Sequence, residues 1–243
     1  MCYVFQPIFS ARTGKVMAYE ALMRSDMEAL RSPATIMKLA REQGALCEIE
    51  RLTFFKSLEN FDHLRSEGLV RRDTMLFINS IASVCLPRED SEYMESRWHE
   101  LCRQMVIEIT EEEEINHEAL EAKRHVPGFS GMFALDDYGS GYNGEAMLLA
   151  VQPDYVKIDV AIVRGVDQDD DKRQLVENLV SYAHVRGIAL VGEGVETRAE
   201  LEALGALGVD YVQGYFLARP ALLPPPVTPE GAECLRALRG EMD

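Results

Sequence analysis

Short apolar segments rich in β-branched and aromatic residues alternate with longer segments of helical periodicity along almost the whole chain. Each short segment is of strand length, and the segments between them repeat apolar residues every three or four positions, as a helix packed on a sheet does. The predicted strands are 3–9, 16–23, 74–79, 105–109, 131–135, 155–158, 188–191 and 211–217.

Helix start and stop signals sharpen several of the intervening segments. Ser32 and Pro33 are typical of the start of a helix over 33–43, and Gly187 of the end of one over 172–186. Thr197 followed three residues later by Glu200 predicts a capping box at the start of a helix over 198–207. Further helices are predicted over 48–64 and 232–239.

About eight strands alternating with helices predict a parallel α/β protein, either an open doubly wound sheet or a closed (β/α)₈ barrel. No GxGxxG motif follows the first strand, so a dinucleotide-binding open sheet loses its main support. Strand number and length favour a modified (β/α)₈ barrel of the TIM type. The link 10–15 between the first two strands has hairpin length and contains Gly14, so the first strand is predicted to be antiparallel to its neighbour.

The domain organisation follows from the absence of any repeat or linker within residues 1–243. Five of the ten prolines lie in 218–231, which predicts an extended strap from about residue 220 leading to a short terminal helix. The whole chain is therefore predicted to form a single domain.

Composition excludes several classes of function. A net charge of −16 opposes binding to nucleic acid polymers or anionic membranes but permits a small phosphate ligand when a divalent cation mediates. Five cysteines without CxxC spacing and five histidines without HExxH disfavour disulfide frameworks and zinc sites. No apolar run approaches the roughly 20 residues of a membrane helix, and the start lacks signal-peptide features, so a cytoplasmic protein without membrane insertion is predicted.

Polar side chains recur at the carboxyl ends of the predicted strands, which converge on one mouth of a barrel. They are Glu20, Asn79, Glu108, Asp136, Asp137, Lys157, Asp159, Glu193, Glu196, Gln213 and Tyr215. Carboxylate and amide oxygens suit Mg²⁺ or Mn²⁺, and two adjacent aspartates suit a pair of cations bridged by Asp136. Lys157 and Arg24 at the same mouth would face an anion, so phosphoryl hydrolysis is indicated.

Each acid has a simpler interpretation when taken alone. A single acid at a strand end is usually a helix cap or a solvated charge, and the runs 111–114 and 169–171 are read as solvated faces. The prediction of a metal site depends on the joint placement of these residues at successive strand ends.

The motifs EALMR, FINS, IEITE, LDDYGSGY, VKID, GEGVE and QGYFLARP, in this order, resemble the EAL-domain family of bacterial cyclic di-GMP phosphodiesterases. The resemblance extends from Phe5 to Pro220, and none of the acidic ligands is missing. It implies a modified barrel that uses two Mg²⁺ or Mn²⁺ ions to hydrolyse one phosphodiester of cyclic di-GMP, giving linear pGpG. Departures from the common pattern are Tyr138, Ser140, Asn143, Gly144 and Gly192.

The resemblance also implies roles for individual residues. Glu20, Asn79, Glu108 and Asp136 would hold the first metal, and Asp136 and Asp137 the second, helped by Glu193 or Asp159. Lys157 would orient the attacking water, Glu193 would be the general base, and Asp137 would complete the catalytic group. The substrate would meet Gln6, Arg24, the Met23 backbone, Glu196, Gln213 and Tyr215, and Glu111 would support the loop 137–144.

Two other functions stay open at this point. The chain could be a receptor that binds cyclic di-GMP without hydrolysing it, or a protein-interaction barrel that ignores the nucleotide; the intact acid ring favours the enzyme. The resemblance implies a homodimer paired through helices beside the loop 137–144, and a sensor domain if the chain is part of a longer protein.

Overall fold

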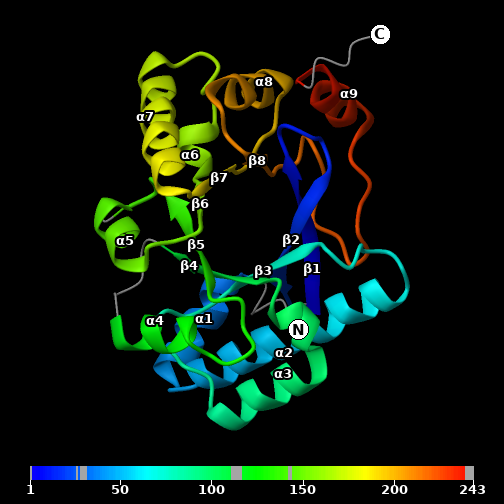
Figure 1. Ribbon diagram of the computed structural model, residues 1–243, viewed down its shortest axis with the longest axis vertical. Helices are drawn as coiled ribbons and strands as arrows, with labels where there is room; N and C mark the ends of the chain where they lie inside the picture. Colours follow the sequence, from blue (N-terminus) through cyan, green and yellow to red (C-terminus); the bar gives the residue numbers. More distant parts are fainter. Residues whose placement is uncertain (1, 26, 28–31, 111–116, 142–143, 239–243) are drawn as a thin grey trace.

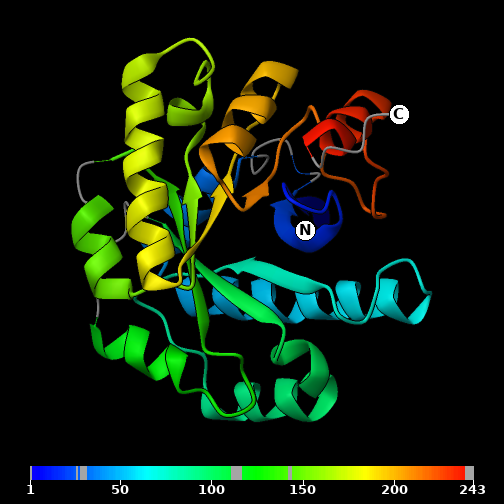
Figure 2. The same cartoon turned by 45° about the horizontal axis from the view of Figure 1, so that its top comes forward.

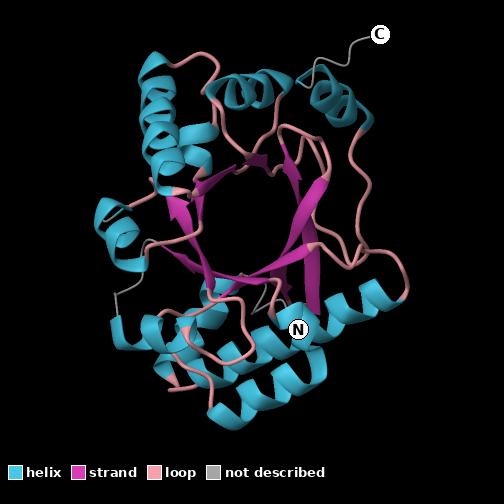
Figure 3. Cartoon of the chain, in the orientation of Figure 1, coloured by secondary structure: helices cyan, strands magenta, loops and turns pink. Residues whose placement is uncertain are grey.

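Eight strands hydrogen-bond in sequence order and close into a barrel, with helices around its outside (Figures 1 and 3). The computed structural model describes residues 2–25, 27, 32–110, 117–141 and 144–238. The strands are β1 (Cys2–Ser10), β2 (Val16–Arg24), β3 (Met75–Asn79), β4 (Met105–Thr110), β5 (Met132–Tyr138), β6 (Tyr155–Ile158), β7 (Ala189–Gly192) and β8 (Tyr211–Val212). The predicted (β/α)₈ class is confirmed.

The antiparallel start of the barrel is also confirmed. β1 pairs antiparallel with both β2 and β8, whereas every other neighbouring pair is parallel. The β1–β2 link closes through hydrogen bonds from Ser10 N to Lys15 O (2.9 Å) and from Gly14 N to Ser10 O (2.8 Å). Gly14 has a φ of 65°, which glycine adopts without the steric penalty of a side chain.

The eighth strand is much shorter than the predicted 211–217. After Val212 the chain turns, and the amides of Leu217 and Ala218 both donate to Gly214 O, at 3.1 and 3.0 Å. A Cβ on Gly214 would lie 2.2 Å from Val195 O, so only glycine permits this close approach of two backbones. Apolar content alone does not distinguish such a turn from a continuing strand.

The helices match the predictions within a few residues where start or stop signals were strong. They are α1 (Pro33–Glu42), α2 (Leu46–Ser66), α3 (Arg88–Cys102), α4 (His117–Arg124), α5 (Gly144–Val151), α6 (Val160–Val163), α7 (Asp170–Arg186), α8 (Arg198–Leu207) and α9 (Pro229–Leu238). Gly187 ends α7 in the left-handed conformation, and Thr197 with Glu200 forms the predicted capping box. Ser32 occupies the N-cap position of α1 but makes no side-chain capping bond.

α7 begins two residues before the predicted start because Asp169 caps it. The Asp169 side chain accepts hydrogen bonds from the amides of Asp171 and Lys172, which satisfies donors at the helix start. The acidic run 169–171 is exposed to solvent, as predicted. The run 111–114 lies outside the described residues.

The barrel interior is filled by layers of side chains, and this layering determines where the polar side chains of the candidate site lie. One cluster of fully buried apolar side chains projects inward from six strands: Ile8, Ala18, Phe77, Val106, Ala134 and Val191. Strand side chains alternate between faces, so residues two positions further on also point inward. In β2, β3, β4 and β5 those positions are Glu20, Asn79, Glu108 and Asp136, and directly after β7 the position is Glu193. An apolar layer therefore lies beneath a polar one.

The proline-rich segment after β8 bridges to the edge of β1 that also pairs with β8. Phe5 and Ala221 exchange two backbone hydrogen bonds, at 2.8 and 3.1 Å. The chain then enters α9, which lies beside α8 and is joined to it by an ion pair between Arg198 and Glu233 (2.9 Å; Figure 2). Among the described residues, no helix has the length and apolar character needed to cross a bilayer.

Candidate active site

One buried lysine stands among four carboxylates at the barrel mouth. The Lys157 side chain projects from β6 and is 1% exposed. Its Nζ lies 2.6 Å from Glu108 Oε1, 2.8 Å from Glu193 Oε1, 2.9 Å from Asp136 Oδ1 and 3.3 Å from Glu20 Oε2. The carboxylates come from β2, β4 and β5 and from the residue after β7, so the fold brings together side chains up to about 170 residues apart in the chain.

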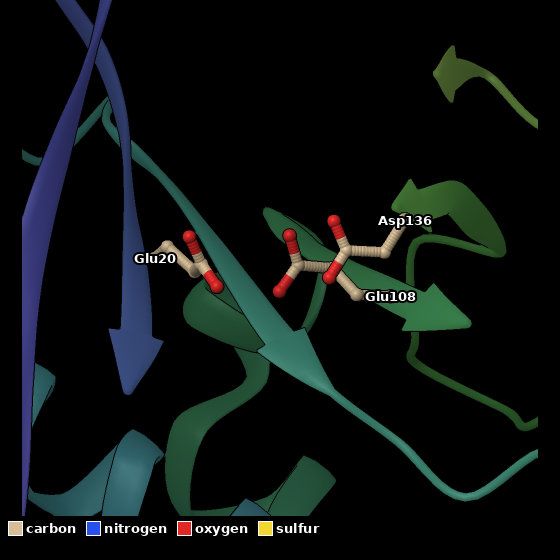
Figure 4. A group of neighbouring side chains, drawn as sticks. All are labelled: Glu20, Glu108 and Asp136. Atoms are coloured by element: carbon tan, nitrogen blue, oxygen red, sulfur yellow. The ribbon is translucent and has the colours of Figure 1, made fainter. Parts of the chain in front are cut away.

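The carboxylates form two overlapping groups that could each hold a cation. Oxygens of Glu20, Glu108 and Asp136 lie within 4.8 Å of one another, and these side chains point toward a common point (Figure 4). Oxygens of Asp136, Asp137 and Glu193 satisfy the same limit. Asp136 belongs to both groups, which is the geometry expected of a bridging ligand.

Asn79 completes the first group. Its Nδ2 donates to Glu108 Oε2 at 3.1 Å and lies 3.4 Å from Glu20 Oε1. Gln213 Nε2 also donates to Glu20 Oε2, at 2.8 Å. These two amides, one from β3 and one following β8, hold the first group of carboxylates in place.

A local backbone distortion lets two consecutive aspartates serve one site. Successive residues of a regular strand point to opposite faces, so Asp136 and Asp137 should diverge. The pairing of β5 with β6 shifts register between Leu135 and Tyr138, and Asp137 has a φ of 55°. A left-handed conformation is costly for a residue with a side chain, and residues held in it cluster at functional sites. Here it brings Asp137 to the side of Asp136.

Burial and mutual repulsion raise the pKa of three carboxyl groups. Burial, reinforced by Glu20, holds the pKa of Glu108 well above its usual range, and burial does the same for Glu193. The pKa of Asp137 rises to about 6 because of burial and the neighbouring Asp136. Carboxyl groups that resist ionisation in this way mark a site with too little positive charge.

Lys157 supplies part of the missing charge. Burial alone would lower its pKa, but the surrounding carboxylates, Asp136 foremost, outweigh burial and raise the pKa well above the usual value. One ammonium nevertheless contacts four carboxylates, and the site holds a fifth carboxyl group, that of Asp137. Gln213 Oε1 is buried and has no hydrogen-bond partner among the described residues. This surplus of oxygen donors and negative charge fits hard divalent cations such as Mg²⁺ or Mn²⁺.

Asp159 lies near this site but is engaged elsewhere. Its carboxylate caps α6 by accepting from Ala161 N at 2.8 Å, and within the described part of the chain it joins neither carboxylate group. Glu193 is therefore better placed than Asp159 to help with a second cation. Glu111, predicted to support the loop 137–144, lies outside the described residues.

The predicted substrate-binding residues lie at the rim and differ in their burial and hydrogen-bond partners. Gln6 is buried and donates to Ala218 O at 3.1 Å. Arg24 is half-buried, and its Nη1 donates to the Met23 carbonyl at 2.8 Å. The side-chain amide of Gln213 donates to Glu20, so this donor already has a protein partner.

Two arginines at the rim were not singled out from the sequence. Arg164 Nη1 pairs with Glu196 Oε2 at 2.6 Å, and this contact lowers the pKa of Glu196. The Arg219 guanidinium lies 4.3 Å from the centre of the half-exposed Tyr215 ring. Arg219 could have been found from the sequence, because it lies four residues after Tyr215 within the motif QGYFLARP. Arg164 lies outside all of the motifs, so no sequence pattern indicates it.

Comparison with known proteins identifies the family. The profile of the EAL domain matches residues 1–220. The chain belongs to the EAL domain family. Curated relatives in Escherichia coli K12 include the probable cyclic di-GMP phosphodiesterase PdeG, 28% identical over 229 residues, and the cyclic di-GMP phosphodiesterase PdeL, 27% identical over 222 residues. These matches cover 89% and 88% of this chain but only 44% and 61% of the relatives, so the chain spans about half their length.

Solved EAL structures share the fold over almost the entire chain. A standalone EAL protein from Vibrio cholerae O395, solved with c-di-GMP bound, is 26% identical, has a TM-score of 0.80 and is covered to 97%, against 95% of this chain. BlrP1 from Klebsiella pneumoniae, solved as a complex with manganese and cyclic di-GMP, is 25% identical with a TM-score of 0.72 over 90% of this EAL chain and 56% of BlrP1. A calcium complex of BlrP1 with the same nucleotide is also similar.

Proposed function

We propose that this EAL domain is a metal-dependent phosphodiesterase that hydrolyses cyclic di-GMP to linear pGpG. The observation that supports it most is the convergence of five carboxyl groups and Asn79 at the barrel mouth, where four of the carboxylates surround one buried lysine. Relatives named as cyclic di-GMP phosphodiesterases support the substrate, and the manganese complex of BlrP1 supports the metal.

The chain would hold two Mg²⁺ or Mn²⁺ ions. Glu20, Asn79, Glu108 and Asp136 are proposed to hold one, and Asp136, Asp137 and Glu193 the other. Such ions would lower the pKa of a water molecule and stabilise charge on the attacking and leaving oxygens of the phosphodiester.

Glu193 and Lys157 are proposed to handle the proton. The raised pKa of Glu193, caused by burial, suits a carboxylate that accepts a proton from the attacking water. Lys157 Nζ lies 2.8 Å from Glu193 Oε1, so it fixes the direction in which this carboxylate points and is placed to orient the water. Asp137, on the other side of Asp136, would complete the catalytic group.

The rim would bind the rest of the nucleotide. Arg24 is proposed to meet a phosphate, with the Met23 backbone next to it. Gln6, which pairs with Glu20 in the β1–β2 ladder, is proposed to contact a guanine. Glu196, Tyr215 and Gln213 would line the remaining wall, with Arg164 and Arg219 orienting the first two. We also propose a cytoplasmic location and, on the resemblance, a homodimer, whose mass sedimentation would test.

One assay tests the proposal. The purified chain is incubated with cyclic di-GMP and Mn²⁺ or Mg²⁺, and the products are separated by chromatography. We expect pGpG from the wild type, none with EDTA, and a loss of orders of magnitude for Glu193→Gln but not for Glu177→Gln, an exposed glutamate on α7. Tight nucleotide binding without pGpG would identify a receptor. No binding and an unchanged melting temperature would identify a protein-interaction barrel.

A further inference from the structure

A second buried polar cluster lies directly behind Asn79, outside the barrel. Glu50 on α2 is 1% exposed, Lys123 on α4 is 5% exposed and Ser80 is 7% exposed. Burying an ion pair costs about as much as its attraction returns, so stability alone does not account for one in the core. The hydrogen-bond partners of these three residues indicate a role other than stabilising the fold.

Both oxygens of Glu50 hold the two residues that follow Asn79. Oε1 accepts from the Ser80 hydroxyl at 2.6 Å, and Oε2 accepts from the Ile81 backbone amide at 2.9 Å. Lys123 Nζ donates to Glu50 Oε1 and, at 2.7 Å, to Ser80 Oγ. The Ser80 hydroxyl therefore donates once and accepts once, and its rotation is fixed.

Ser80 connects this cluster to the candidate active site. Its backbone amide donates to Glu108 O at 3.0 Å, and the preceding residue is Asn79. Asn79 in turn donates to the side chain of Glu108 at 3.1 Å. The end of β3 is thus held from outside the barrel by Glu50 and from inside by Glu108.

We propose that Glu50 is a positioning residue that fixes the Asn79 carboxamide for metal binding, with Ser80 and Lys123 holding Glu50 in place. This inference rests on the proposed function, because it assumes that Asn79 contributes to the metal site. Without Glu50 the residues 80 and 81 lose their anchor, and the Asn79 side chain samples other orientations. Partners that orient a metal ligand typically contribute about 10–100-fold to metal affinity.

The first experiment examines the metal-free protein. The side-chain amide resonance of Asn79, identified by its loss in Asn79→Asp, is compared by NMR in wild type, Glu50→Gln and the control Asp90→Asn. Asp90 on α3 is a matched control because it is buried and pairs at 3.0 Å with Arg51, the residue next to Glu50 on α2. We expect a shifted or broadened Asn79 signal in Glu50→Gln alone. An unchanged signal in Glu50→Gln overturns the proposal.

The second experiment measures Mn²⁺ binding by calorimetry in the same three proteins. We expect the Mn²⁺ Kd to rise about 10–100-fold in Glu50→Gln and to stay within about twofold of wild type in Asp90→Asn. This difference should hold even if both variants have a lower melting temperature than wild type. If Glu50→Gln fails to fold, Ser80→Ala, which removes one hydroxyl, replaces it with an expected rise of about 2–10-fold.

The outcomes separate this inference from the proposed function. An unchanged Mn²⁺ Kd with a lowered melting temperature in Glu50→Gln means that Glu50 is merely structural, and the proposal falls. A wild type that binds no Mn²⁺ overturns the metal-dependent function instead, and the NMR comparison in the metal-free protein then decides whether Glu50 positions Asn79.

Discussion

Replacing Lys157 by methionine tests the charge balance of the barrel mouth. Methionine keeps most of the length of the side chain but removes the ammonium that contacts four carboxylates at 2.6–3.3 Å. In the absence of divalent cations, those carboxylates then lose their buried counter-ion. Lys157→Met should therefore destabilise the metal-free protein.

The size of the effect follows from the burial. Removing one partner of a buried ion pair costs about 3–5 kcal/mol because the other charge stays behind unpaired. In a domain of this size each 1 kcal/mol lowers the melting temperature by about 2–4 °C, so a fall of roughly 6–20 °C is expected in EDTA. Protonation relieves the repulsion, so the deficit should shrink near pH 5 and grow toward pH 8.

Thermal unfolding in EDTA at these two pH values measures the deficit. Lys56→Met is the matched control: Lys56 is half-exposed and pairs with Glu59 at 2.7 Å, a surface contact worth about 0.3–0.5 kcal/mol. Saturating Mn²⁺ should restore more stability to Lys157→Met than to the wild type. A melting temperature for Lys157→Met within about 2 °C of wild type at pH 8 in EDTA would refute the reasoning.

Three further outcomes are expected. Glu20→Ala should weaken Mn²⁺ binding by at least about 100-fold in calorimetry, because a ligand matters more than the partners that orient it. The pKa of Asp137 is raised to about 6, so the stability that its protonated form contributes is present at low pH and is lost as the pH rises through that value. Between pH 4 and pH 7 the wild type should lose about 1–2 kcal/mol of unfolding free energy relative to Asp137→Asn, a figure reduced for solvent screening. Urea unfolding in EDTA measures this difference. Gly214→Ala should destabilise by more than about 3 kcal/mol because its Cβ meets Val195 backbone, whereas Gly44→Ala, with open space, should cost only about 1 kcal/mol of backbone strain.

The strand ends were predictable because strand and helix periodicities are local properties of the sequence. Glu20, Glu108 and Asp136 each follow an apolar segment, and the parallel strands of a closed barrel have their carboxyl ends at one mouth. Their convergence thus follows from the topology once the strands are located. The strong helix signals, such as Gly187 after α7, depend equally on neighbouring residues.

What could not be predicted depends on contacts between distant elements or on backbone dihedrals. The pairing of Glu50 with Lys123 joins two helices 73 residues apart in the sequence, and no spacing rule indicates it. The left-handed conformation of Asp137 coincides with a register shift between β5 and β6. In the sequence Gly214 looks like an ordinary strand glycine, and only the structure shows that its backbone lies close to that of Val195.

The same excess of negative charge should govern both folding and cation binding. Carboxyl groups with raised pKa repel one another in the metal-free barrel and hence destabilise it at neutral pH, whereas bound cations relieve that repulsion. A variant such as Asp137→Asn should therefore change two quantities in opposite directions: the metal-free protein becomes more stable and the stabilisation by Mn²⁺ becomes smaller. We therefore expect the buried Lys157 to let the chain fold without a cation, and we expect the remaining uncompensated charge to favour cation binding.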